Sequence, residues 1–288
     1  MKNLQKHQKR IVEIIQKNGP EEAEFQEFDS IIDDIDNALE GEKFRTLIAV
    51  VLENDTIFGH TYKKPFGYAG DFLLIEKIYQ KFESENLIFK KWDKFYHSHE
   101  ATTAVRNRKT FCLQKLEELI KTKDSVKVLV LGSGPSTDIH EFLEKNSTAD
   151  IHFDLLDIDS NAISYASEKN KKYLKKINFI KANVIRFTTE EKYDFIWSAG
   201  LFDYLDDKLF VFLLKRFYSN LKENGQIIIG NFSPLNPTIK VMEIMTEWYL
   251  NYRNEEHLTR LAREATIKDS KITIEKEALG INLFLKIK

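Results

Sequence analysis

Two different hydrophobic patterns divide the chain near residue 122. Up to about residue 120, apolar residues recur at three- and four-residue spacing, as in IVEIIQ, FDSIIDDIDNAL and FRTLIAVVLEN. This spacing predicts amphipathic helices, and no sustained alternating pattern of strands occurs there. A break with one proline and two glycines, Lys63 to Asp71, separates these segments from further helical patterns over 72–79 and 101–121. We therefore expect a helical N-terminal domain over residues 1–122.

From Val126 onward, short apolar runs alternate with helical patterns. Such alternation predicts an α/β fold with a doubly wound, mostly parallel sheet over residues 123–288. Near the C-terminus the pattern changes to two strand-like runs joined by a short segment with Gly280, which we expect to close the sheet with one antiparallel strand. The expected strands are 126–131, 151–157, 177–181, 193–198, 225–231, 271–275 and 282–288.

The most informative stretch is VKVLVLGSGPSTD, in which a buried-strand pattern ends in Gly132-Ser133-Gly134. Glycines permit backbone conformations and close approaches that a side chain would block. The next expected strand ends in Asp157, whose carboxylate could accept hydrogen bonds from two ribose hydroxyls. Thr137 or Asp138 could cap a following helix over about 140–145. Strand, glycine turn, helix and acid together predict a site for a nucleoside-bearing cofactor.

The turn lacks the features that a pyrophosphate needs. Thr137 stands where a dinucleotide fingerprint has its third glycine, and Pro135 removes one backbone N–H from the turn. NAD is therefore disfavoured. A cofactor without phosphates fits better, and S-adenosylmethionine is the leading candidate.

Composition excludes several other classes of protein. The net charge of −2 and the pI of about 6.4 give no bulk attraction to nucleic acid or to an anionic membrane. Cys112 is the single cysteine, so an internal disulfide is impossible, as expected for a reducing compartment. We see no apolar core of a signal peptide and no run of ~20 apolar residues. A cytoplasmic protein without a membrane span is expected, and its oligomeric state stays open.

With these motifs together, the region from Val126 to the C-terminus resembles a class I S-adenosylmethionine-dependent methyltransferase. The resemblance rests on LVLGSGPSTD, LLDID, INFIKAN, YDFIWSAGLFDYLDD, LKENGQIIIGNF and the terminal strand pair. It implies a Rossmann-like, seven-stranded sheet and S-adenosylmethionine as cofactor. In that family the glycine turn approaches the methionine part of the cofactor, and the acid after the second strand holds the ribose. By resemblance these roles fall to Gly132, Ser133, Gly134 and Asp157.

Residues after the second and third strands are further cofactor candidates. Ile158 could pack on the adenine face, whereas Asp159 is favoured as a solvated loop acid. Asn183, followed by Val184, stands where family members often have an aspartate that accepts from the adenine amino group. Its amide oxygen could also accept, and an asparagine that only forms a turn fits nearly as well.

The fourth expected strand ends at the edge where open α/β sheets bind ligands. Small residues there, Ser198, Ala199 and Gly200, leave room for the sulfonium and the methyl acceptor. The Asn/Asp-Pro-Pro-aromatic motif of many DNA and RNA amino-group methyltransferases is absent, which favours another acceptor. Tyr204 could line the pocket, or it could equally be an aromatic of the core.

The helical half contains candidates for acceptor binding. Arg108 lies three residues after Val105 and four before Cys112, and so on the apolar stripe of its expected helix. A guanidinium that faces the core requires an anionic partner, either a protein carboxylate or a ligand. KPFGYAGD and AVRNR resemble a bacterial methyltransferase subgroup assigned to 3-hydroxypalmitate methyl ester (extracellular factor) biosynthesis. That resemblance places Tyr68, Arg106 and Arg108 over the cofactor or the acceptor.

The predicted function is methylation of a small molecule, at an oxygen of a carboxylic or hydroxy acid. A carboxylate needs no general base, whereas a hydroxyl would need one, such as His97, His99 or Tyr204. The two histidines point apart on a helix, so we expect no metal site. The helical half would act as a lid, with apolar walls from Phe58, Phe66, Phe72, Trp92, Phe95 and Trp248. The alternatives are a protein or RNA methyltransferase and a non-catalytic S-adenosylmethionine-binding regulator.

Overall fold

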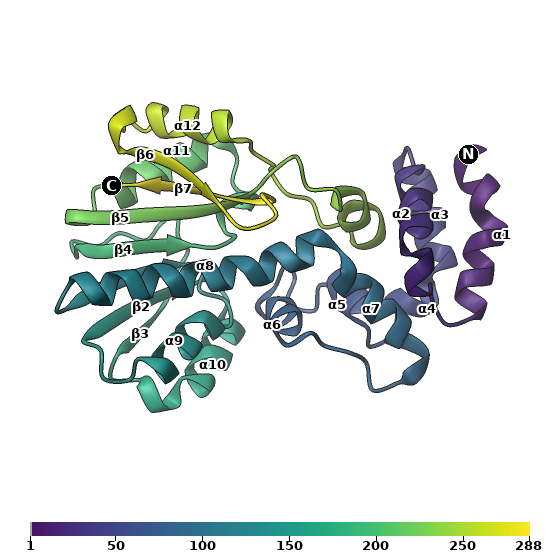
Figure 1. The fold of residues 1–288 in the computed structure, drawn as a ribbon, viewed down its shortest axis with the longest axis horizontal. Helices are drawn as coiled ribbons and strands as arrows, with labels where there is room; N and C mark the ends of the chain where they lie inside the picture. The colour runs from purple at the N-terminus through teal and green to yellow at the C-terminus, as the bar shows by residue number, and fades with distance from the viewer. Residues whose placement is uncertain (1) are drawn as a thin grey trace. The chain divides into compact units, whose positions relative to one another are not determined.

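The computed structural model describes residues 2–288, which form two compact units (Figure 1). A helical unit takes in residues up to Thr103 together with 236–249, and a sheet unit takes in Ala104–Leu235 and Leu250–Lys288. The division falls inside the long helix α8 (Glu100–Thr122) and not at residue 122, where the sequence pattern changes. The physical reason is that Phe111, Cys112 and Leu116 of α8 belong to the core on one face of the sheet.

The helical unit is built from short amphipathic helices, as the sequence predicts. Its loop at 64–71 lies between α5 and α6, where the proline and the glycines occur. After strand β5 (Leu221–Phe232) the chain adds a π-helix, Val241–Met245, to this unit. The helices are α1 (Lys2–Gln16), α2 (Phe25–Asp33), α3 (Ala38–Leu47), α4 (Ala49–Leu52), α5 (Ile57–Lys63), α6 (Phe72–Gln80), α7 (Lys90–Ser98) and the first residues of α8.

Aromatic rings form the centre of the helical unit. The Phe28 ring lies 5.6 Å from the Trp92 ring and 5.4 Å from the Phe95 ring, edge to face in both pairs. Phe58 meets Tyr96 edge to face, whereas its ring is tilted by 33° against that of Phe95. Such pairs add about 0.5–1.5 kcal/mol each beyond their buried area. Three of the aromatics considered as pocket walls, Phe58, Trp92 and Phe95, are thus fully buried core residues.

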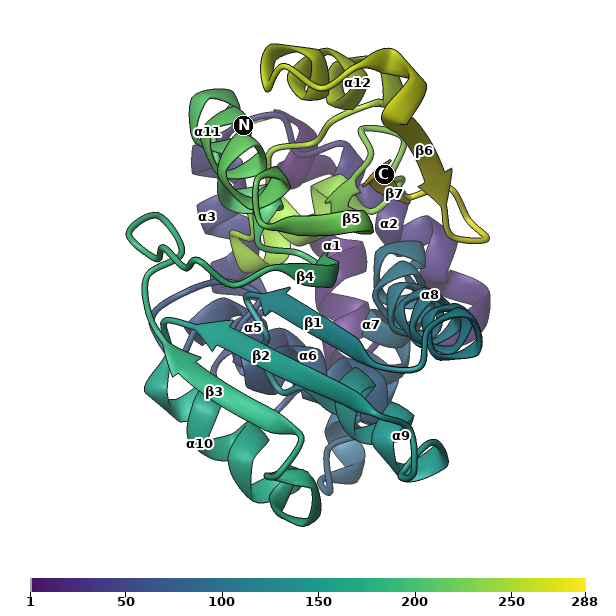
Figure 2. The same cartoon turned by 90° about the vertical axis from the view of Figure 1, so that its left-hand side faces the viewer.

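A seven-stranded sheet forms the second unit, in the order β3-β2-β1-β4-β5-β7-β6 (Figure 2). The first five strands are parallel, and β7 is antiparallel to both of its neighbours, as predicted for the closing pair. The strands are β1 (Val126–Leu131), β2 (Ile151–Asp157), β3 (Ile177–Lys181), β4 (Tyr193–Ser198), β5 (Leu221–Phe232), β6 (Ile272–Lys276) and β7 (Asn282–Ile287).

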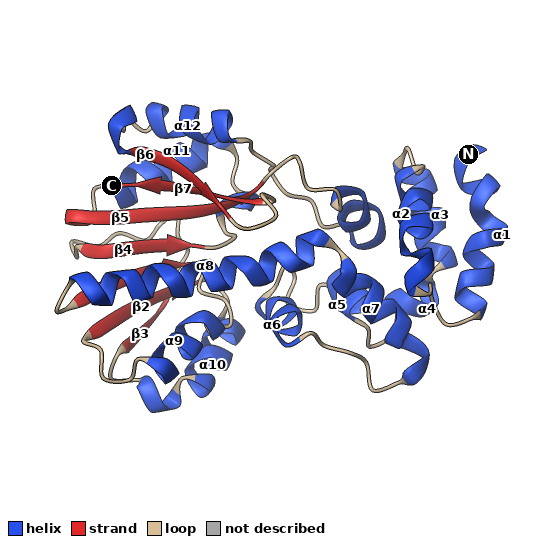
Figure 3. Cartoon of the chain, viewed as in Figure 1, coloured by secondary structure: helices blue, strands red, loops and turns tan. Residues whose placement is uncertain are grey.

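Helices cover both faces of this sheet (Figures 2 and 3). One face packs against α8, α9 (Thr137–Lys145) and α10 (Ser160–Lys169). The other face packs against α11 (Asp207–Tyr218) and α12 (Glu255–Glu264). Burial on both faces explains why β1 and β4 read as nearly continuous apolar runs. The predicted α/β fold with a doubly wound sheet and an N-terminal helical region is confirmed.

Candidate active site at the carboxyl edge of the sheet

The glycine turn after β1 is tied to the neighbouring strand. The backbone N–H groups of Gly132 and Ser133 both donate to the carbonyl of Leu156, at 2.9 and 3.1 Å. Gly132 has φ +68°, and a Cβ there would lie 3.1 Å from the Cβ of Leu201. Glycine is therefore required at this position both by backbone conformation and by the close approach of the loop after β4.

The helix after the turn begins earlier than the sequence suggests. Ser136 is at the N-cap position with φ 52°, and α9 starts at Thr137. Neither Thr137 nor Asp138 caps the helix, so that expectation is wrong. Asp138 is buried instead, where its Oδ1 accepts from the N–H of Ile139 at 2.9 Å. The chain therefore enters the helix directly from the left-handed Ser136.

Asp157 lies directly beside the turn. Its Oδ2 accepts from the backbone N–H of Gly134 at 2.9 Å, and its Oδ1 accepts from the N–H of Asp159 at 3.0 Å. Burial raises the pKa of this carboxyl, and the backbone N–H donors counteract the rise. A carboxylate has about four acceptor positions, so capacity remains for ligand hydroxyls. The acid and the turn that the sequence singled out therefore form one site.

The two residues after Asp157 differ in their roles. Ile158 exposes 61% of its surface, an unusual position for a large aliphatic side chain that follows a buried strand. Asp159 caps α10, with its Oδ1 accepting from the N–H of Asn161 at 2.8 Å. This cap agrees with the structural reading of Asp159, whereas Ile158 stays a candidate for stacking against a planar group.

The residues after β3 mainly shape a turn. The Oδ1 of Asn183 accepts from the N–H of Ile185 at 2.8 Å, as a turn-forming asparagine does. Val184 is buried and packs in the core between the sheet and α11. A contact of either residue with the adenine stays a prediction.

At the end of β4, small residues leave space that a buried arginine from α8 occupies. The hydroxyl of Ser198 donates to the Leu131 carbonyl at 3.1 Å, which joins the ends of β4 and β1. A Cβ on Gly200 would lie 2.8 Å from the Nη1 of Arg108. The small residues therefore let a guanidinium from α8 reach the edge of the sheet between these two strands.

Arg108 and Ser133 have buried polar groups that lack hydrogen-bond partners within the residues that the structure describes. Arg108 is only 6% exposed, and its Nε has no hydrogen-bond partner among residues 2–288. The buried hydroxyl of Ser133 likewise has no partner in the described part of the chain. Leaving such groups unpaired costs about 1–3 kcal/mol each, and more for a charged one. Two orphaned polar groups beside the glycine turn are what a site for a charged, polar cofactor would contain.

Two further predicted residues lie in the sheet unit, and their roles stay predictions. Arg106, also on α8, is half-buried, and burial lowers its pKa. Tyr204 lies in a 3-10 turn, Phe202–Tyr204, and is 43% exposed. Its exposure excludes the reading of Tyr204 as a core aromatic. A catalytic role for this hydroxyl stays a prediction.

Tyr68 and His99 belong to the helical unit. Tyr68 is 37% exposed in the loop between α5 and α6. His99 is buried, with its Nε2 3.0 Å from Asp29 Oδ1 and its Nδ1 3.3 Å from the Tyr96 carbonyl. Both ring nitrogens thus have partners within that unit. The roles of Tyr68 and His99 toward cofactor or acceptor stay predictions, while the turn, Asp157, Ser198, Gly200 and Arg108 come together at one edge.

Sequence reasoning missed Asp203. This carboxyl is 1% exposed, and its Oδ1 accepts from the N–H of Phe232 at 2.7 Å. Burial raises its pKa to about 7, against the opposing effect of Arg108 and Arg253. The sequence did contain a signal of this burial: in LFDYL the acid stands between two aromatic residues, and a surface turn seldom surrounds a carboxylate with apolar side chains.

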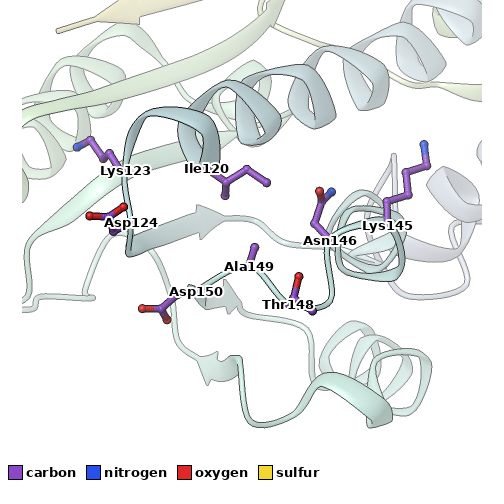
Figure 4. A pocket seen from close by; sticks show the side chains of 8 residues that line it. All are labelled: Ile120, Lys123, Asp124, Lys145, Asn146, Thr148, Ala149 and Asp150. Atoms are coloured by element: carbon purple, nitrogen blue, oxygen red, sulfur yellow. The ribbon is translucent and has the colours of Figure 1, made fainter.

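A separate pocket lies at the opposite, amino edge of the sheet (Figure 4). It has a volume of about 370 Å³, and its rim mixes lysines with acids. It is formed by the end of α8, the end of α9 and the loop before β2, away from the glycine turn. Its lining residues are Ile120, Lys123, Asp124, Lys145, Asn146, Thr148, Ala149 and Asp150.

Comparison with known proteins agrees with this geometry. A family model described as a methyltransferase domain matches residues 122–278, more than half of the chain. The chain belongs to the methyltransferase domain family. The predicted class I S-adenosylmethionine-dependent methyltransferase is therefore confirmed at the level of the family, and S-adenosylmethionine is the cofactor of that family.

Within residues 2–288, no three His, Cys, Asp or Glu residues are grouped to hold a metal. The helices of this part of the chain all fall short of the length or the hydropathy that a membrane span requires.

One curated relative shares part of this methyltransferase. The malonyl-[acyl-carrier protein] O-methyltransferase 1 of Ilyobacter polytropus is 31% identical over 119 residues. The match covers 41% of this chain and 42% of the relative, so the two share less than half of their lengths.

Solved structures show the same fold at low identity. A Bordetella parapertussis structure described as a possible exported protein has a TM-score of 0.63 and 17% identity, with 75% of this chain and 78% of that chain covered. The apo structure of the S-adenosylmethionine-dependent methyltransferase SibL has a TM-score of 0.52 and 12% identity, with 88% of this chain and 78% of SibL covered. At such identities these likenesses concern the fold.

Proposed function

We propose that this methyltransferase transfers a methyl group from S-adenosylmethionine to an oxygen of a small carboxylic or hydroxy acid. The observation that carries the proposal is Arg108, a buried guanidinium with an unpaired Nε at the ends of β1 and β4. Such a group favours a carboxylate ligand, which can belong to the cofactor or to the acceptor. The partial relative that methylates malonyl-[acyl-carrier protein] at oxygen is compatible with an acid acceptor.

The residues around the glycine turn fit the cofactor. The remaining acceptor capacity of Asp157 would receive the ribose hydroxyls, and the exposed side chain of Ile158 would lie on the adenine ring. The close-approaching backbone at Gly132 and the unpaired Ser133 hydroxyl would face the methionine part. The hydrogen bonds of the turn to Leu156 and Asp157 hold this backbone in place before ligand arrives, which lowers the entropic cost of binding.

S-adenosylmethionine supplies an electrophilic methyl group on a sulfonium. The protein's own contribution is to align an acceptor oxygen in line with that methyl, and positioning can supply about 7–11 kcal/mol of barrier reduction. Arg108 would orient the acid by two parallel N–H donors, and the small side chains of Ala199 and Gly200 leave space at the reacting centre. An acceptor carboxylate is ionised at neutral pH and needs no base.

A hydroxyl acceptor would need a base within reach. Tyr204 is the better placed candidate, because it is exposed at the carboxyl end of β4. His99 is held by Asp29 and the Tyr96 carbonyl within the helical unit. The sequence likeness of KPFGYAGD and AVRNR to the 3-hydroxypalmitate methyl ester subgroup makes 3-hydroxy fatty acids the first acceptors to test, with Tyr68 and Arg106 as proposed contacts.

The proposal is tested by the release of S-adenosylhomocysteine from S-adenosylmethionine with matched acceptors. Fatty acids and 3-hydroxy acids should support turnover, whereas their primary amides should not. Arg108→Met should lose most of this turnover, because the guanidinium is removed but the side-chain length is kept. Turnover with an amine, a protein or an RNA, and none with acids, would instead establish one of the alternative functions.

A further inference from the structure

The side chain of Asn282, the first residue of β7, is buried with both of its polar atoms unpaired. Asn282 is fully buried, and neither its Nδ2 nor its Oδ1 has a hydrogen-bond partner among residues 2–288. An amide side chain has two N–H donors and an acceptor oxygen, and burial of such groups without partners is costly. This amide is therefore a candidate contact for a polar group of a ligand.

The register of β7 places Asn282 at the carboxyl edge of the parallel strands. Because β7 runs antiparallel to β5, its first residue pairs with Phe232, the last residue of β5. β4 ends at Ser198, which pairs with Ile229, so the start of β7 lies beyond the end of β4. Open α/β sheets bind their ligands at this edge.

Asn282 also lies on the face of the sheet that α8 covers. Side chains two residues apart on a strand share a face, and Phe284 stacks on Phe111 of α8 with ring centroids 3.9 Å apart. Leu283, between them, belongs to the core on the opposite face. The unpaired guanidinium of Arg108 reaches the sheet from the same helix. Two unpaired polar side chains therefore share one edge and one face of the sheet.

Glu277, in the turn between β6 and β7, connects that helix to the start of β7. Its carboxylate accepts from the Nδ2 of Asn107 on α8 at 2.7 Å and from the backbone N–H of Asn282 at 3.2 Å. The N–H groups of Leu279 and Ile281 donate to it as well, at 2.9 and 2.8 Å. Four donors fill the acceptor positions of this carboxylate, so the side-chain amide of Asn282 keeps its capacity for a ligand.

The strand order separates Asn282 from the residues proposed to hold the cofactor. The glycine turn follows β1 and Asp157 ends β2, whereas β4 and β5 lie between β1 and β7. At about 4.8 Å per strand, β7 is roughly 14 Å from β1 but only about 10 Å from β4, after which Gly200 and the Arg108 guanidinium lie. Asn282 is therefore placed to contact the methyl acceptor and not the cofactor.

We propose that Asn282 binds a hydroxyl group of the methyl acceptor, so that the enzyme selects hydroxy acids over acids without a hydroxyl. This inference rests on the proposed function, in which Arg108 binds the carboxylate of an acid. A hydroxyl can both donate to an amide oxygen and accept from an amide N–H, whereas a carboxylate can only accept and an ammonium can only donate. A charged group beside this neutral side chain would also lack a counter-ion.

The selection follows from what an acceptor without the hydroxyl leaves behind. Such an acceptor fills the site and keeps the buried amide unpaired, whereas a hydroxy acid satisfies it. A site built to hydrogen-bond a hydroxyl rejects analogues that lack it for this reason. One buried polar group left unpaired corresponds to a loss of roughly tenfold to a hundredfold in kcat/KM.

Turnover of 3-hydroxydecanoate and of decanoate tests this inference, with release of S-adenosylhomocysteine as the readout. The two acids have the same chain length, so the ratio of their kcat/KM values isolates the hydroxyl. We expect a ratio of about ten or more in favour of the hydroxy acid. Turnover of both acids with equal kcat/KM would overturn the inference and leave the proposed function intact. Turnover of neither would overturn the proposed function, and the inference with it.

Two variants assign the selection to its residue. Asn282→Leu keeps the side-chain volume and should bring the ratio close to one, mainly by raising KM for the hydroxy acid. Asn178→Leu is the matched control, because it makes the same change on β3 at the far edge of the sheet, where the amide donates to Asp154 at 2.8 Å. The control should keep the wild-type ratio. A wild-type ratio in Asn282→Leu would overturn the assignment.

Thermal unfolding without ligand shows whether Asn282→Leu is folded. Its Tm should be equal to or above that of the wild type, because the change removes a buried polar group that has no partner in the described chain. If Asn282→Leu does not fold, Asn282→Ser replaces it: the shorter side chain withdraws from the ligand, and the same fall of the ratio is expected. A ratio unchanged in Asn282→Ser would then overturn the assignment.

Discussion

The carboxylate of Asp157, at the end of β2, accepts a hydrogen bond from the backbone N–H of Gly134 at 2.9 Å. This bond joins two features that lie 23 residues apart in the sequence and that together form the proposed cofactor site. The acid thus fixes the turn, and in the proposed function its remaining acceptor capacity would receive the ligand.

Replacement of Asp157 should weaken cofactor binding more than it weakens the fold. Asp157→Ala removes acceptors for the ribose hydroxyls, and hydrogen bonds to a charged group contribute about 1.5–3 kcal/mol. We expect the affinity for S-adenosylhomocysteine to fall by roughly tenfold or more, measured by titration calorimetry. Asp159→Asn, which keeps the cap of α10, should leave the affinity within about twofold. Unchanged affinity in Asp157→Ala would remove this acid from the site.

Gly200→Ala should displace the Arg108 guanidinium and leave the surrounding structure almost unchanged. The new Cβ would lie 2.8 Å from the Arg108 Nη1, which is the end of a flexible side chain and can move away. The KM for the ligand that pairs with this arginine should rise by about an order of magnitude, a loss typical of one charge-assisted hydrogen bond. The free energy of unfolding should change by less than about 1 kcal/mol.

A double-mutant cycle checks that prediction. The cycle is measured as ligand dissociation constants by titration calorimetry, since Arg108→Met is expected to lose turnover. In that background, Gly200→Ala should have almost no further effect on the dissociation constant, because the contact is already gone. Additive effects of the two changes would contradict the proposed contact.

Asp203 should make stability depend on pH in a defined direction. Its pKa is raised to about 7 in the folded chain, above the ordinary value of 3.8. The folded state therefore binds the proton more tightly, so this contribution to stability is complete below about pH 4 and is lost as pH rises through about 7. Asp203→Asn should consequently gain stability relative to wild type between pH 4 and pH 8, by an amount on the order of a few kcal/mol at most.

Denaturant unfolding of the two proteins at pH 4, 6 and 8 measures this difference directly. The comparison with the variant removes the contributions of other acids, such as Asp194 and Asp207, whose lowered pKa values act in the opposite direction. A difference that stays constant with pH would show that Asp203 does not titrate in this range.

In the helical unit, the Asp93 carboxylate connects α7 to the start of α5 and to the loop after α6. Its Oδ1 accepts from the N–H of Ile57 at 2.9 Å, and its Oδ2 accepts from the N–H of Ser84 at 2.8 Å. Asp93→Ala leaves both buried donors without partners and should cost roughly 3 kcal/mol of unfolding free energy. Hydrogen exchange of the Ile57 and Ser84 amides should be faster in this variant than in the wild type.

Asp55→Ala is a suitable control for that change. Asp55 is 83% exposed and forms a surface ion pair with Lys77 at 3.6 Å, so its loss should cost less than about 0.5 kcal/mol. Equal effects of the two substitutions would contradict the structural role of Asp93.

The strands were predictable because burial on both faces selects unbroken apolar runs. β1, β2, β3 and β4 begin and end where the runs in the sequence do. β5 extends back to Leu221, through the polar residues of LKENG, because Leu221 pairs with Tyr193 of β4. A pairing partner, which no local pattern reveals, adds those residues to the strand.

Site residues were predictable where a local sequence pattern alone determines their position. The spacing of Val105, Arg108 and Cys112 placed the arginine on a buried face, and all three are buried. Asp203 could not be found in this way, because its burial depends on the end of β5 and on Arg253, some 30 to 50 residues away in sequence. The start of α9 was missed because a serine with positive φ is uncommon and has no sequence signature.

Transfer of a trideuterated methyl group tests the central claim most directly. The protein is incubated with S-adenosylmethionine carrying that label and with an equimolar mixture of 3-hydroxy acids, fatty acids and their amine counterparts, and the products are identified by mass spectrometry. We predict that an acid gains the label at oxygen, and that Arg108→Met abolishes the product. Label found on an amine, or on none of the small molecules while the protein binds S-adenosylhomocysteine, would contradict the account.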